Sequence, residues 1–338
     1  MINVQTHHGF YCVKFEPFER SDFFTITDAH VAKLYPNLRV DLILEPGESS
    51  KDFVHYQQVI AALADARVQR KSTVVALGGG VIGDLVGFAA ATYMRGIRFI
   101  QVPTTLLAQV DSSVGGKVGI DLAQGKNLVG AFYPPCEVIV DTRFIQSLPL
   151  REFRCGLAEV LKYGLILDRE LWNQLIASPL TALSTELSSV IERCIRLKAD
   201  VVESDEFETK GERAKLNFGH TVGHAIEVRT GYEKYTHGEA ISLGMVAESW
   251  IAEKMGIAKR GLSEAIQTGL VQNGLPVRGL LGGNPSDLVQ SMKLDKKSEN
   301  GTLVMSLVTD IGTCELVKDV PESVVVKVLS EMSDDAGM

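Results

Sequence analysis

The stretch STVVALGGGVIGD, residues 72–84, decides the fold class of this 338-residue chain. Its first half is rich in β-branched and aliphatic residues, glycines follow, and a helical pattern continues from them, which predicts a strand, a tight turn and a helix. Gly78, Gly80 and Gly83 satisfy the pattern GxGxxG, in which backbone N–H groups approach a pyrophosphate at the helix N-terminus. Such a turn can also serve packing alone, so both roles stay open at this point.

Similar patterns surround this stretch through the first 145 residues. Short β-rich runs alternate with helical patterns, at residues 23–27, 40–44, 59–69, 85–93, 98–103 and 137–141. Such alternation predicts a largely parallel sheet with helices on both faces, as in nucleotide-binding domains.

The pattern changes after residue 148. Segments such as LAEVLKYGLI, LSSVIERCIRLKADVV and GEAISLGMVAESWIAEKMG carry the 3.6-residue period of helices, and residues 303–308 suit a short strand. The sequence therefore predicts an α/β domain over residues 1–148 and a mostly helical domain over residues 149–338.

The composition limits the classes of function. A net charge of -8 argues against a broad nucleic-acid surface, although a local group of cations could still bind a small anion. The five cysteines are scattered and never in CxxC spacing, so we expect reduced thiols. Residues 1–20 lack the pattern of a secretory signal, and no apolar run reaches about 18 residues. We therefore expect a cytoplasmic protein that does not bind membranes.

The usual dinucleotide fingerprint has an acid about 20 residues after the glycines, where it holds the ribose. Here that region reads RFIQVPTT, residues 98–105, and contains no acid. If NAD binds, the available ribose partners are Asp28 or the turn that contains Glu48 and Lys51, because both follow earlier predicted strands.

The segment QVPTTLLAQVDSSVGGKVGIDLAQGKN, residues 101–127, is too polar and glycine-rich for a core element, and we expect a long loop. It concentrates side chains that suit an oxyanion: Thr104, Thr105, Asp111, Lys117, Lys126 and Asn127. Together with Lys198, Arg213 and the lysines of residues 295–297, they could line an anion site in an acidic protein. The alternative is a solvated surface.

Histidines cluster in and after KLNFGHTVGHAIE, residues 215–227. His220 and His224 are spaced i, i+4 on one helix face, and His237 follows, so they could bind a divalent metal with a carboxylate. We expect the glycines beside each histidine to leave room for a ligand. The candidate carboxylate is Glu159, on an apolar helix with Lys162 one turn later. The alternatives are a structural histidine pair and a Glu–Lys surface pair.

Six motifs in this order resemble the 3-dehydroquinate synthase family: GGGVIGD, VPTTLLAQVDSSVGGKVGID, GKNLVGAFYPP, GLAEVLKYG, LNFGHTVGHAIE and HGEA. The resemblance implies a Rossmann-like NAD-binding domain followed by a mainly α-helical metal-binding domain. Members convert 3-deoxy-D-arabino-heptulosonate 7-phosphate to 3-dehydroquinate and phosphate, in the shikimate pathway to aromatic amino acids. Transient oxidation by NAD, phosphate elimination, reduction and an intramolecular aldol step make the enzyme a phosphorus–oxygen lyase.

The resemblance also implies roles for individual residues. The ligands of a zinc or cobalt ion are Glu159, His220 and His237. Catalytic contacts come from Asp111, Lys162, Asn217 and His224, so that His224 is a site residue and not a ligand. Substrate contacts come from Arg95, Lys117, Asn127, Lys198, Glu208, Arg213, Lys296 and Lys297. NAD contacts come from Asp28, Glu48, Lys51, Gly78, Gly79, Gly80, Val81, Asp84, Thr104, Thr105, Asp111, Lys117, Lys126, Phe144 and Ser147. In this family Arg95 can reach the phosphate from a neighbouring subunit, which implies a homodimer.

The sequence departs from the family pattern at a few positions, and related functions are the alternatives. His30 stands where Asn is common, Ser147 stands where Thr is usual, and DEFETKGER and the loop at residues 231–237 each contain one extra residue. Another sugar-phosphate cyclase, such as 2-epi-5-epi-valiolone synthase or 2-deoxy-scyllo-inosose synthase, is disfavoured by retained polar positions: Lys198, Arg213, Asn217 and His224. A metal-dependent alcohol or glycerol dehydrogenase would not need the lysine-rich segment. A catalytically silent NAD- or metal-binding protein is the third alternative.

Overall fold

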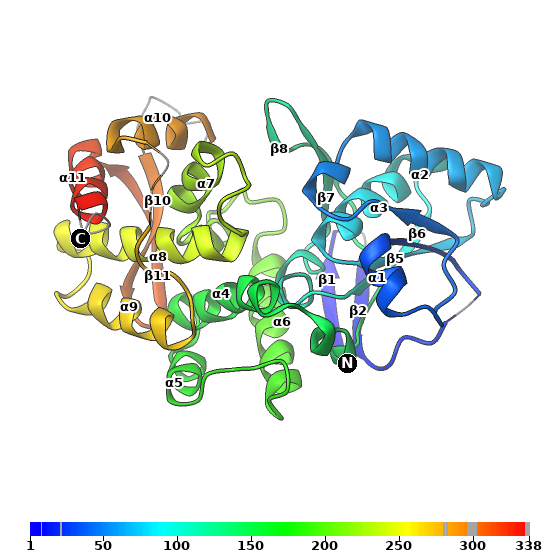
Figure 1. Cartoon of the computed structure of the whole chain (residues 1–338), viewed down its shortest axis with the longest axis horizontal. Coiled ribbons are helices and arrows are strands. Elements are labelled where there is room, and N and C mark those ends of the chain that lie inside the picture. Colours follow the sequence, from blue (N-terminus) through cyan, green and yellow to red (C-terminus); the bar gives the residue numbers. More distant parts are fainter. Residues whose placement is uncertain (8, 21, 280, 282, 296–302, 335–338) are drawn as a thin grey trace. The chain divides into compact units, whose positions relative to one another are not determined.

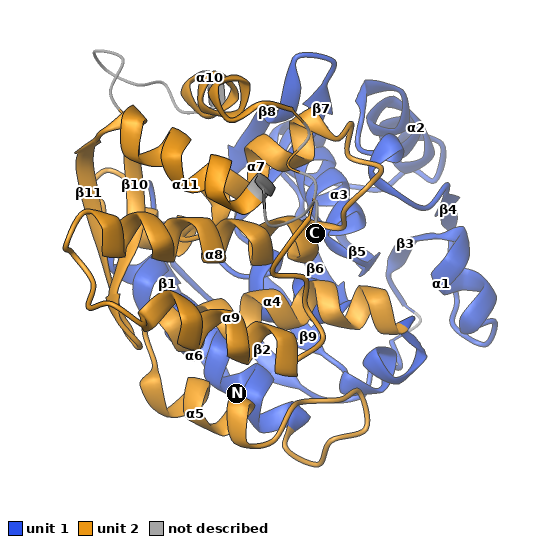
Figure 2. Cartoon of the chain, turned by 60° about the vertical axis from the view of Figure 1, so that its left-hand side comes forward, with its two compact units in different colours: residues 1–149, 187–207 blue, residues 150–186, 208–338 orange. Residues whose placement is uncertain are grey.

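The chain folds into two compact units (Figures 1 and 2). This computed structural model describes residues 1–334 apart from residues 8, 21, 280, 282 and 296–302. Unit 1 comprises Met1–Pro149 and Leu187–Phe207, and unit 2 comprises Leu150–Glu186 and Glu208–Met338. The sequence-based division treats everything after residue 148 as one domain, whereas the contacts group residues 187–207 with the first unit.

Unit 1 is built on a seven-stranded sheet in the order β1-β2-β9-β6-β5-β3-β4. The strands are β1 (Ile2–Thr6), β2 (Gly9–Phe15), β3 (Phe24–Asp28), β4 (Leu42–Leu44), β5 (Thr73–Gly78), β6 (Arg98–Pro103) and β9 (Glu137–Val140). β1 and β2 pair antiparallel, and the other neighbouring strands of this sheet pair parallel. The prediction of a largely parallel α/β domain is confirmed.

Helices cover both faces of this sheet. They are α1 (Ala29–Leu34), α2 (Phe53–Asp65), α3 (Gly80–Thr92) and α6 (Leu187–Ser204), with the short helical turns η1 (Glu48–Ser50), η2 (Tyr93–Arg95), η3 (Ala108–Ser112) and η4 (Thr142–Ser147). Val74 and Ala76 of β5 pack in a cluster with α2 and α3, whereas Val75 and Leu77 pack in a second cluster with α1 and η4. A strand buried on both faces is apolar at every position, which is why this run lacks alternation.

The expectation of one long loop over residues 101–127 was wrong for its second half. These residues enter a hairpin of β7 (Lys117–Leu122) and β8 (Gly125–Phe132). Gly119 and Gly130 are paired in this hairpin, and a Cβ on either would overlap the backbone of the opposite strand. The glycines that permit this close pairing also remove the hydrophobic alternation by which strands are predicted.

The hairpin of β1 and β2, which the sequence did not predict, extends the sheet, and α6 packs against β1. Two carboxylates accept hydrogen bonds from backbone amides at this edge. Glu203 Oε1 accepts from the Gln5 N–H at 2.7 Å, and Glu206 Oε2 accepts from the His7 N–H at 2.6 Å. Because an edge strand exposes N–H groups that can pair with other chains, these acids protect the edge. They also help to explain why α6 is grouped with unit 1.

Removal of these two acids should weaken unit 1. We expect the double substitution Glu203→Ala and Glu206→Ala to lower the free energy of unfolding by about 1–2 kcal/mol, since each hydrogen bond contributes on the order of 1 kcal/mol. Urea unfolding followed by circular dichroism measures this change. Glu192→Ala on the same helix is the control, because its exposed pair with Arg196 contributes at most about 0.5 kcal/mol. Equal losses in both variants would contradict the role of the edge contacts.

Unit 2 is largely helical, as predicted. Its helices are α4 (Leu150–Ile166), α5 (Arg169–Ala177), η5 (Arg213–Asn217), α7 (His220–Arg229), α8 (His237–Lys254), α9 (Leu262–Gln272), α10 (Pro285–Asp295) and α11 (Glu322–Asp334). A two-stranded antiparallel sheet is formed by β10 (Leu303–Asp310) and β11 (Thr313–Val320), so the strand expected at residues 303–308 is present. α8 packs against α4, α7, α9, α11 and β10, which explains why most of its side chains are buried.

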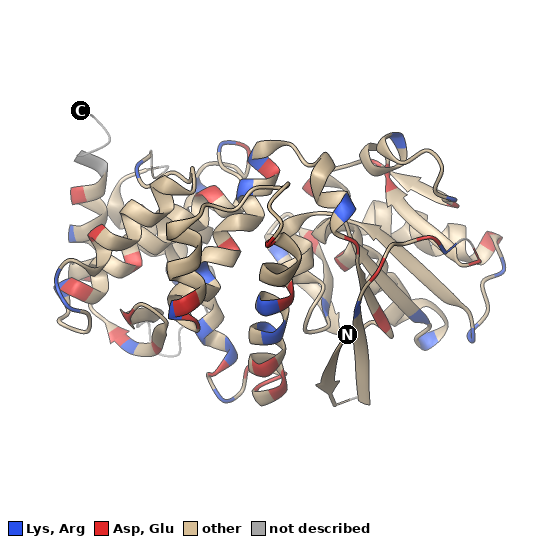
Figure 3. Cartoon of the chain, turned by 90° about the horizontal axis from the view of Figure 1, so that it is seen from below, with Lys and Arg blue, Asp and Glu red and all other residues tan. Residues whose placement is uncertain are grey.

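Charged residues of both signs lie on the described helices and strands. Figure 3 shows Lys and Arg positions interspersed with Asp and Glu positions on elements of both units. Within the described part of the chain, no helix has both the length and the apolarity needed to cross a bilayer.

Candidate functional site

The predicted NAD contacts of unit 1 gather at one edge of its sheet. They lie at or after the carboxyl ends of parallel strands: Asp28 at β3, Glu48 and Lys51 after β4, Gly78, Gly79, Gly80, Val81 and Asp84 at β5, Thr104 and Thr105 after β6, and Phe144 and Ser147 after β9. Ligands of open α/β sheets bind outside this edge. The parallel sheet therefore brings together segments that are far apart in the sequence.

The glycine-rich turn leads from β5 into α3, with Gly79 as the N-cap residue and no side-chain cap on the first turn. A Cβ on Gly79 would lie 3.1 Å from Thr105 Cγ2, and a Cβ on Gly80 would lie 3.2 Å from Ser112 Oγ. Both distances are shorter than ordinary van der Waals contact, so larger residues would crowd the space beside the helix N-terminus. The turn fits a cofactor pyrophosphate, which requires close approach to backbone N–H groups.

A buried lysine connects the turn after β4 to α3 and to the β7–β8 hairpin. Lys51 Nζ donates to Asp84 Oδ2 and to Asn127 Oδ1, each at 2.6 Å. Burial lowers the pKa of Lys51, but the nearby carboxylates of Asp84 and Glu48 outweigh burial and raise the pKa above its ordinary value. The lysine therefore stays charged and holds three predicted site segments together.

Asp121, on β7, was not singled out from the sequence. Its backbone N–H donates to the Lys51 carbonyl oxygen at 2.7 Å, and its Oδ1 accepts from the Asn127 N–H at 2.8 Å. Asn127 has a φ of 57°, a left-handed conformation that asparagine tolerates better than most residues, and the hydrogen bond to Asp121 helps to hold it. An acid at the end of the apolar run KVGID is the sequence signal that could have identified this residue.

Some predicted NAD contacts already have partners within unit 1. The Phe144 ring is buried, with its centroid 4.8 Å from that of Tyr35. Ser147 Oγ accepts from Tyr35 Oη and donates to the Phe144 carbonyl oxygen, both at 2.9 Å. Asp28 Oδ1 caps α1 by accepting from the Val31 N–H at 2.9 Å. Because the Phe144 side chain lies in the core, its contact with a cofactor would involve the backbone.

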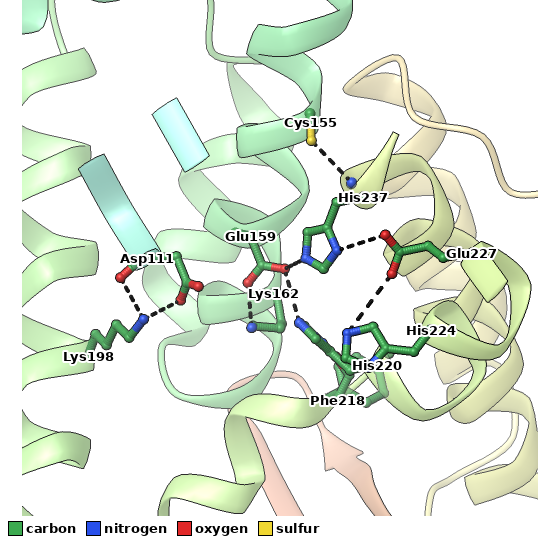
Figure 4. Close-up of polar contacts among 12 residues, drawn as sticks. Asp111, Cys155, Glu159, Lys162, Lys198, Phe218, His220, His224, Glu227 and His237 are labelled. Atoms are coloured by element: carbon green, nitrogen blue, oxygen red, sulfur yellow. Dashed lines mark hydrogen bonds and ion pairs between the residues drawn. The ribbon is translucent and has the colours of Figure 1, made fainter. Parts of the chain in front are cut away.

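A predicted catalytic residue and a predicted substrate contact form an ion pair in unit 1 (Figure 4). Lys198 Nζ, on α6, donates to Asp111 Oδ1 at 2.8 Å and to the Asp111 carbonyl oxygen at 2.6 Å. Asp111 lies in η3, a π-helical turn, and such turns recur at functional sites. Lys198 is buried, whereas Lys117 at the start of β7 is exposed. Lys126 Nζ lies 3.5 Å from Glu48 Oε1.

Arg95 lies in a strained turn. Met94, Arg95 and Gly96 have positive φ angles of 52°, 66° and 117°. Left-handed backbone costs about 1–2 kcal/mol at a non-glycine residue and is typical of functional positions. The Tyr133 hydroxyl donates to the Ile97 carbonyl oxygen at 2.9 Å and packs beside Gly96, which fixes the turn. The side chain of Arg95 is exposed, and the contacts of Tyr133 hold the backbone of its turn.

In unit 2 the three predicted metal ligands converge (Figure 4). Glu159 of α4 is fully buried, and its Oε1 lies 3.5 Å from His220 Nε2 and 3.5 Å from His237 Nε2. The three ligand atoms lie within 4.8 Å of one another. One carboxylate oxygen and two imidazole nitrogens suit zinc or cobalt, and three protein ligands are usual in catalytic zinc sites, which keep one position for substrate.

The entry into α7 fixes His220. Gly219 has a φ of 81°, which glycine adopts without strain. Glu248 of α8 is buried and accepts from the Gly219 N–H at 2.7 Å and the Val222 N–H at 3.0 Å, so it caps the first turn of α7. His220 Nδ1 lies 3.1 Å from the Phe218 carbonyl oxygen. This contact holds a proton on Nδ1 and leaves the lone pair of Nε2 for a metal.

A capping box fixes His237, the first residue of α8. Thr236 Oγ1 accepts from the Glu239 N–H at 3.3 Å, and Glu239 Oε2 accepts from the Thr236 N–H at 2.8 Å. Arg151 of α4 donates to both Glu239 oxygens, at 2.9 and 2.7 Å. The start of α8 is therefore held against α4, the helix that carries Glu159.

One sequence-based interpretation of this cluster was wrong, and one of the alternatives is excluded. The glycines beside the histidines do not leave room for a ligand, since a Cβ on Gly219, Gly223 or Gly238 would overlap atoms of α8 or α4. They allow close helix packing instead. Glu159 and Lys162 are not a surface pair, because they form a direct ion pair at 0% and 2% exposure. A buried ammonium requires such a partner.

Burial and neighbouring charges act differently on the two histidines nearest Glu159. Burial lowers the pKa of His220 well below its ordinary value, and the Lys162 ammonium lowers it further. Burial also lowers the pKa of His237, but hydrogen bonds to Glu159 and Glu227 outweigh it and raise the pKa well above the ordinary value. In the metal-free protein His220 is thus a neutral imidazole, the form that binds metals. His237 lies between two carboxylates and holds a second proton, which a metal ion on Nε2 would displace.

Glu227, the last residue of the motif KLNFGHTVGHAIE, was also missed. It is 5% exposed, with Oε1 3.5 Å from His237 Nδ1 and Oε2 4.0 Å from His224 Nε2. Its sequence signal is its spacing, because it follows His220 by seven residues and His224 by three and so shares their helix face.

The other predicted catalytic and substrate-binding residues of unit 2 lie before α7 or outside the described residues. Arg213 and Asn217 begin and end η5, with Arg213 buried and Asn217 partly exposed. Glu208 is exposed and has a φ of 57°. Lys296 and Lys297 lie outside the residues that the structure describes.

The first unit has a glycine-rich turn at the carboxyl edge of a parallel sheet, and the helical unit has a cluster of one buried glutamate and two partly buried histidines. Both features are typical of metal-dependent enzymes that use a nucleotide cofactor. Residues 41–155 match the family description "3-dehydroquinate synthase N-terminal", and residues 156–298 match "3-dehydroquinate synthase C-terminal". The chain belongs to the 3-dehydroquinate synthase family.

Individual relatives agree with this membership. The 3-dehydroquinate synthase of Desulforamulus reducens is 44% identical over 320 residues, which cover 90% of this chain and 89% of the relative. The 2-epi-5-epi-valiolone synthase of Streptomyces hygroscopicus subsp. jinggangensis, solved with NAD+ and Zn2+, has a TM-score of 0.88 at 25% identity and covers 96% of this chain and 97% of its own. A 2-deoxy-scyllo-inosose synthase, solved with carbaglucose-6-phosphate, NAD+ and Co2+, has a TM-score of 0.84 at 27% identity over 98% of this chain and 99% of its own.

Proposed function

We propose that this chain is a 3-dehydroquinate synthase, a lyase that converts 3-deoxy-D-arabino-heptulosonate 7-phosphate to 3-dehydroquinate and phosphate in the shikimate pathway. Family membership over residues 41–298 supports this function, as does the 44% identity to a relative of that name. The structural observation that carries it is the convergence of Glu159, His220 and His237 from three helices.

The enzyme uses NAD and a divalent metal ion, zinc or cobalt. Two solved proteins of the same fold contain NAD+ with Zn2+ or with Co2+, and the glycine turn and the carboxylate–histidine cluster of this chain fit these groups. When bound, the metal supplies Lewis acidity toward a substrate hydroxyl and NAD supplies a transient hydride acceptor. Lys162 contacts the Glu159 carboxylate and brings a buried positive charge to the place where a substrate oxygen would gain negative charge.

Cations and polar groups of each unit suit the anionic ends of the substrate. In unit 1, the buried Lys198 forms an ion pair with the partly exposed Asp111, which preorganises its ammonium for a carboxylate or a phosphate. In unit 2, the buried Arg213 offers a planar donor fork, and His224 lies beside the metal ligands with its ring centroid 5.2 Å from that of His220.

We assign Arg95 to the phosphate group in a neighbouring subunit, so that the enzyme is a homodimer. Met94 and Arg95 are consecutive left-handed residues, and such strained backbone is evidence that the turn carrying Arg95 has a function. We also assign the enzyme to the cytoplasm, where thiols stay reduced, since Cys12, Cys136, Cys155, Cys194 and Cys314 carry no disulfide. The partners are thus a small phosphorylated sugar acid and a second copy of the chain.

A substrate comparison tests this function against the other cyclases. We expect phosphate release from the heptulosonate phosphate to exceed release from sedoheptulose 7-phosphate or glucose 6-phosphate by about 100-fold or more, because a site built to pair a carboxylate rejects substrates that lack it. Release should require NAD and should stop on addition of a chelator. A preference for either of the other phosphates would overturn the assignment. Stoichiometric NADH formation from glycerol would indicate a polyol dehydrogenase instead.

A further inference from the structure

Two sets of potential metal ligands share one histidine. Glu159, His220 and His237 form the first set, and His224, Glu227 and His237 form the second. They use opposite nitrogens of the shared ring, as Figure 4 shows: Nε2 lies 3.5 Å from Glu159 Oε1, and Nδ1 lies 3.5 Å from Glu227 Oε1. A neutral imidazole carries its proton on one nitrogen, so one side of the ring can bind a metal while the other side is held by a hydrogen bond.

The geometry places the metal on the Glu159 side. His220 Nδ1 is held by the Phe218 carbonyl oxygen, so its Nε2 is available for a metal and lies 3.5 Å from the same Glu159 oxygen. Two Nε2 atoms and one carboxylate oxygen therefore converge there. On the opposite side, His224 Nε2 lies farther from its carboxylate, at 4.0 Å from Glu227 Oε2, and its side chain is 39% exposed against 13% for His220.

We propose that Glu227 is a positioning residue that joins the metal ligand His237 to the substrate-facing His224. This inference rests on the proposed function for the metal site and for the role of His224. Glu227 Oε1 accepts the proton on His237 Nδ1, which fixes the tautomer and aims the Nε2 lone pair at the metal. Its other oxygen faces His224 Nε2, so one carboxylate sets both rings.

The location of Glu227 supports this role. It lies on the inward face of α7, 5% exposed, at i+3 from His224 and i+7 from His220. A buried carboxylate is costly unless hydrogen bonds or charges compensate it, and the two imidazoles contribute that compensation. The carboxylate is thus placed by the same helix that supplies one ligand and one substrate contact.

Metal affinity tests the contact with His237. Glu227→Gln keeps the size of the side chain but replaces one acceptor oxygen with a donor, and we expect the affinity of the metal-free protein for Zn2+ and Co2+ to fall about 10–100-fold. Competition with a chromophoric chelator measures the affinity, and the Co2+ absorption spectrum reports ligand geometry. Glu227→Asp keeps the charge with a shorter reach and should show an intermediate loss. The matched control is Glu253→Gln, which removes a carboxylate of α8 that accepts from Ser263 and should leave the affinity unchanged.

Wild-type affinity in Glu227→Gln would overturn the proposal. If that variant does not fold, as judged by thermal unfolding, Glu227→Asp takes its place, and wild-type affinity in it has the same meaning. For His224, we expect the losses in kcat/KM of Glu227→Gln and His224→Ala, both measured at saturating metal, to be non-additive in the double variant. Additive losses would remove His224 from the proposal. Wild-type protein that binds metal but releases no phosphate would refute the proposed function and leave the positioning role standing.

Discussion

Glu159→Gln should abolish both metal binding and phosphate release. The substitution replaces a buried anionic oxygen with a neutral amide oxygen, and the two remaining imidazoles do not form the three-ligand set that a catalytic zinc site requires. We expect no stoichiometric metal after dialysis, measured by plasma mass spectrometry. Turnover should fall about 10³-fold or more, which corresponds to the several kcal/mol that a bound Lewis acid supplies.

The same substitution should also lower stability, and this effect must be separated from loss of the metal. Lys162 is 2% exposed and forms an ion pair with Glu159, so the variant leaves a buried ammonium with only an amide oxygen at that position. Removing one partner of a buried pair costs about 3–5 kcal/mol, and an amide that still accepts a hydrogen bond should bring the loss toward the lower end. Denaturant unfolding of the metal-free wild type and the metal-free variant measures this loss of the ion pair separately from the loss of the metal. Glu253→Gln is the control, and wild-type metal content in Glu159→Gln would contradict the ligand assignment.

Local sequence patterns identified the histidines but paired them wrongly. The i, i+4 spacing joins His220 to His224, whereas the structure joins His220 to His237 at the start of the next helix. No local period connects either residue to Glu159, which lies on a separate helix. Its position on an apolar helix made it the candidate carboxylate, and the resemblance to the family implied its role as a ligand. The three residues meet because α4, α7 and α8 pack closely, with Gly238 against the Cys155 backbone.

The sheet topology supplies an acid beside the glycine turn, although the usual ribose position lacks one. That usual position follows the strand after the glycine turn, which is β6. In the sheet, β5 lies between β6 and β3. The strand β3 comes before β5 in the chain and ends at Asp28. Because Thr27 pairs with Leu77, Asp28 lies beside Gly78. The acid beside Gly78 is therefore supplied by an earlier strand. The sequence named Asp28 as one of two candidates but could not show that it lies beside Gly78. It also could not show the contact between Gln5 and Glu203, which joins distant parts of the chain.

Gly244→Ala should be strongly destabilising. A Cβ on Gly244 of α8 would overlap the Gly219 carbonyl oxygen and lie 2.9 Å from the Gly223 backbone nitrogen. Because both obstacles are backbone atoms, no change of rotamer relieves the collision, and α7 and α8 must separate. We expect the free energy of unfolding to fall by about 3 kcal/mol or more, which is the upper end of the range that overpacking a protein core usually costs. Urea unfolding of the metal-free protein measures the loss.

The control for this prediction is Gly256→Ala, just after α8. Gly256 has a φ of 71°, and a Cβ added there would meet nothing within 4 Å, so alanine adds about 1–2 kcal/mol of backbone strain without a collision. The two variants should also differ in metal affinity, since Gly219 directly precedes His220 and any displacement of α7 moves that ligand. Gly244→Ala should therefore bind Co2+ more weakly than Gly256→Ala even where both are folded. Equal stability and equal affinity in the two variants would contradict the close α7–α8 packing on which the position of His220 depends.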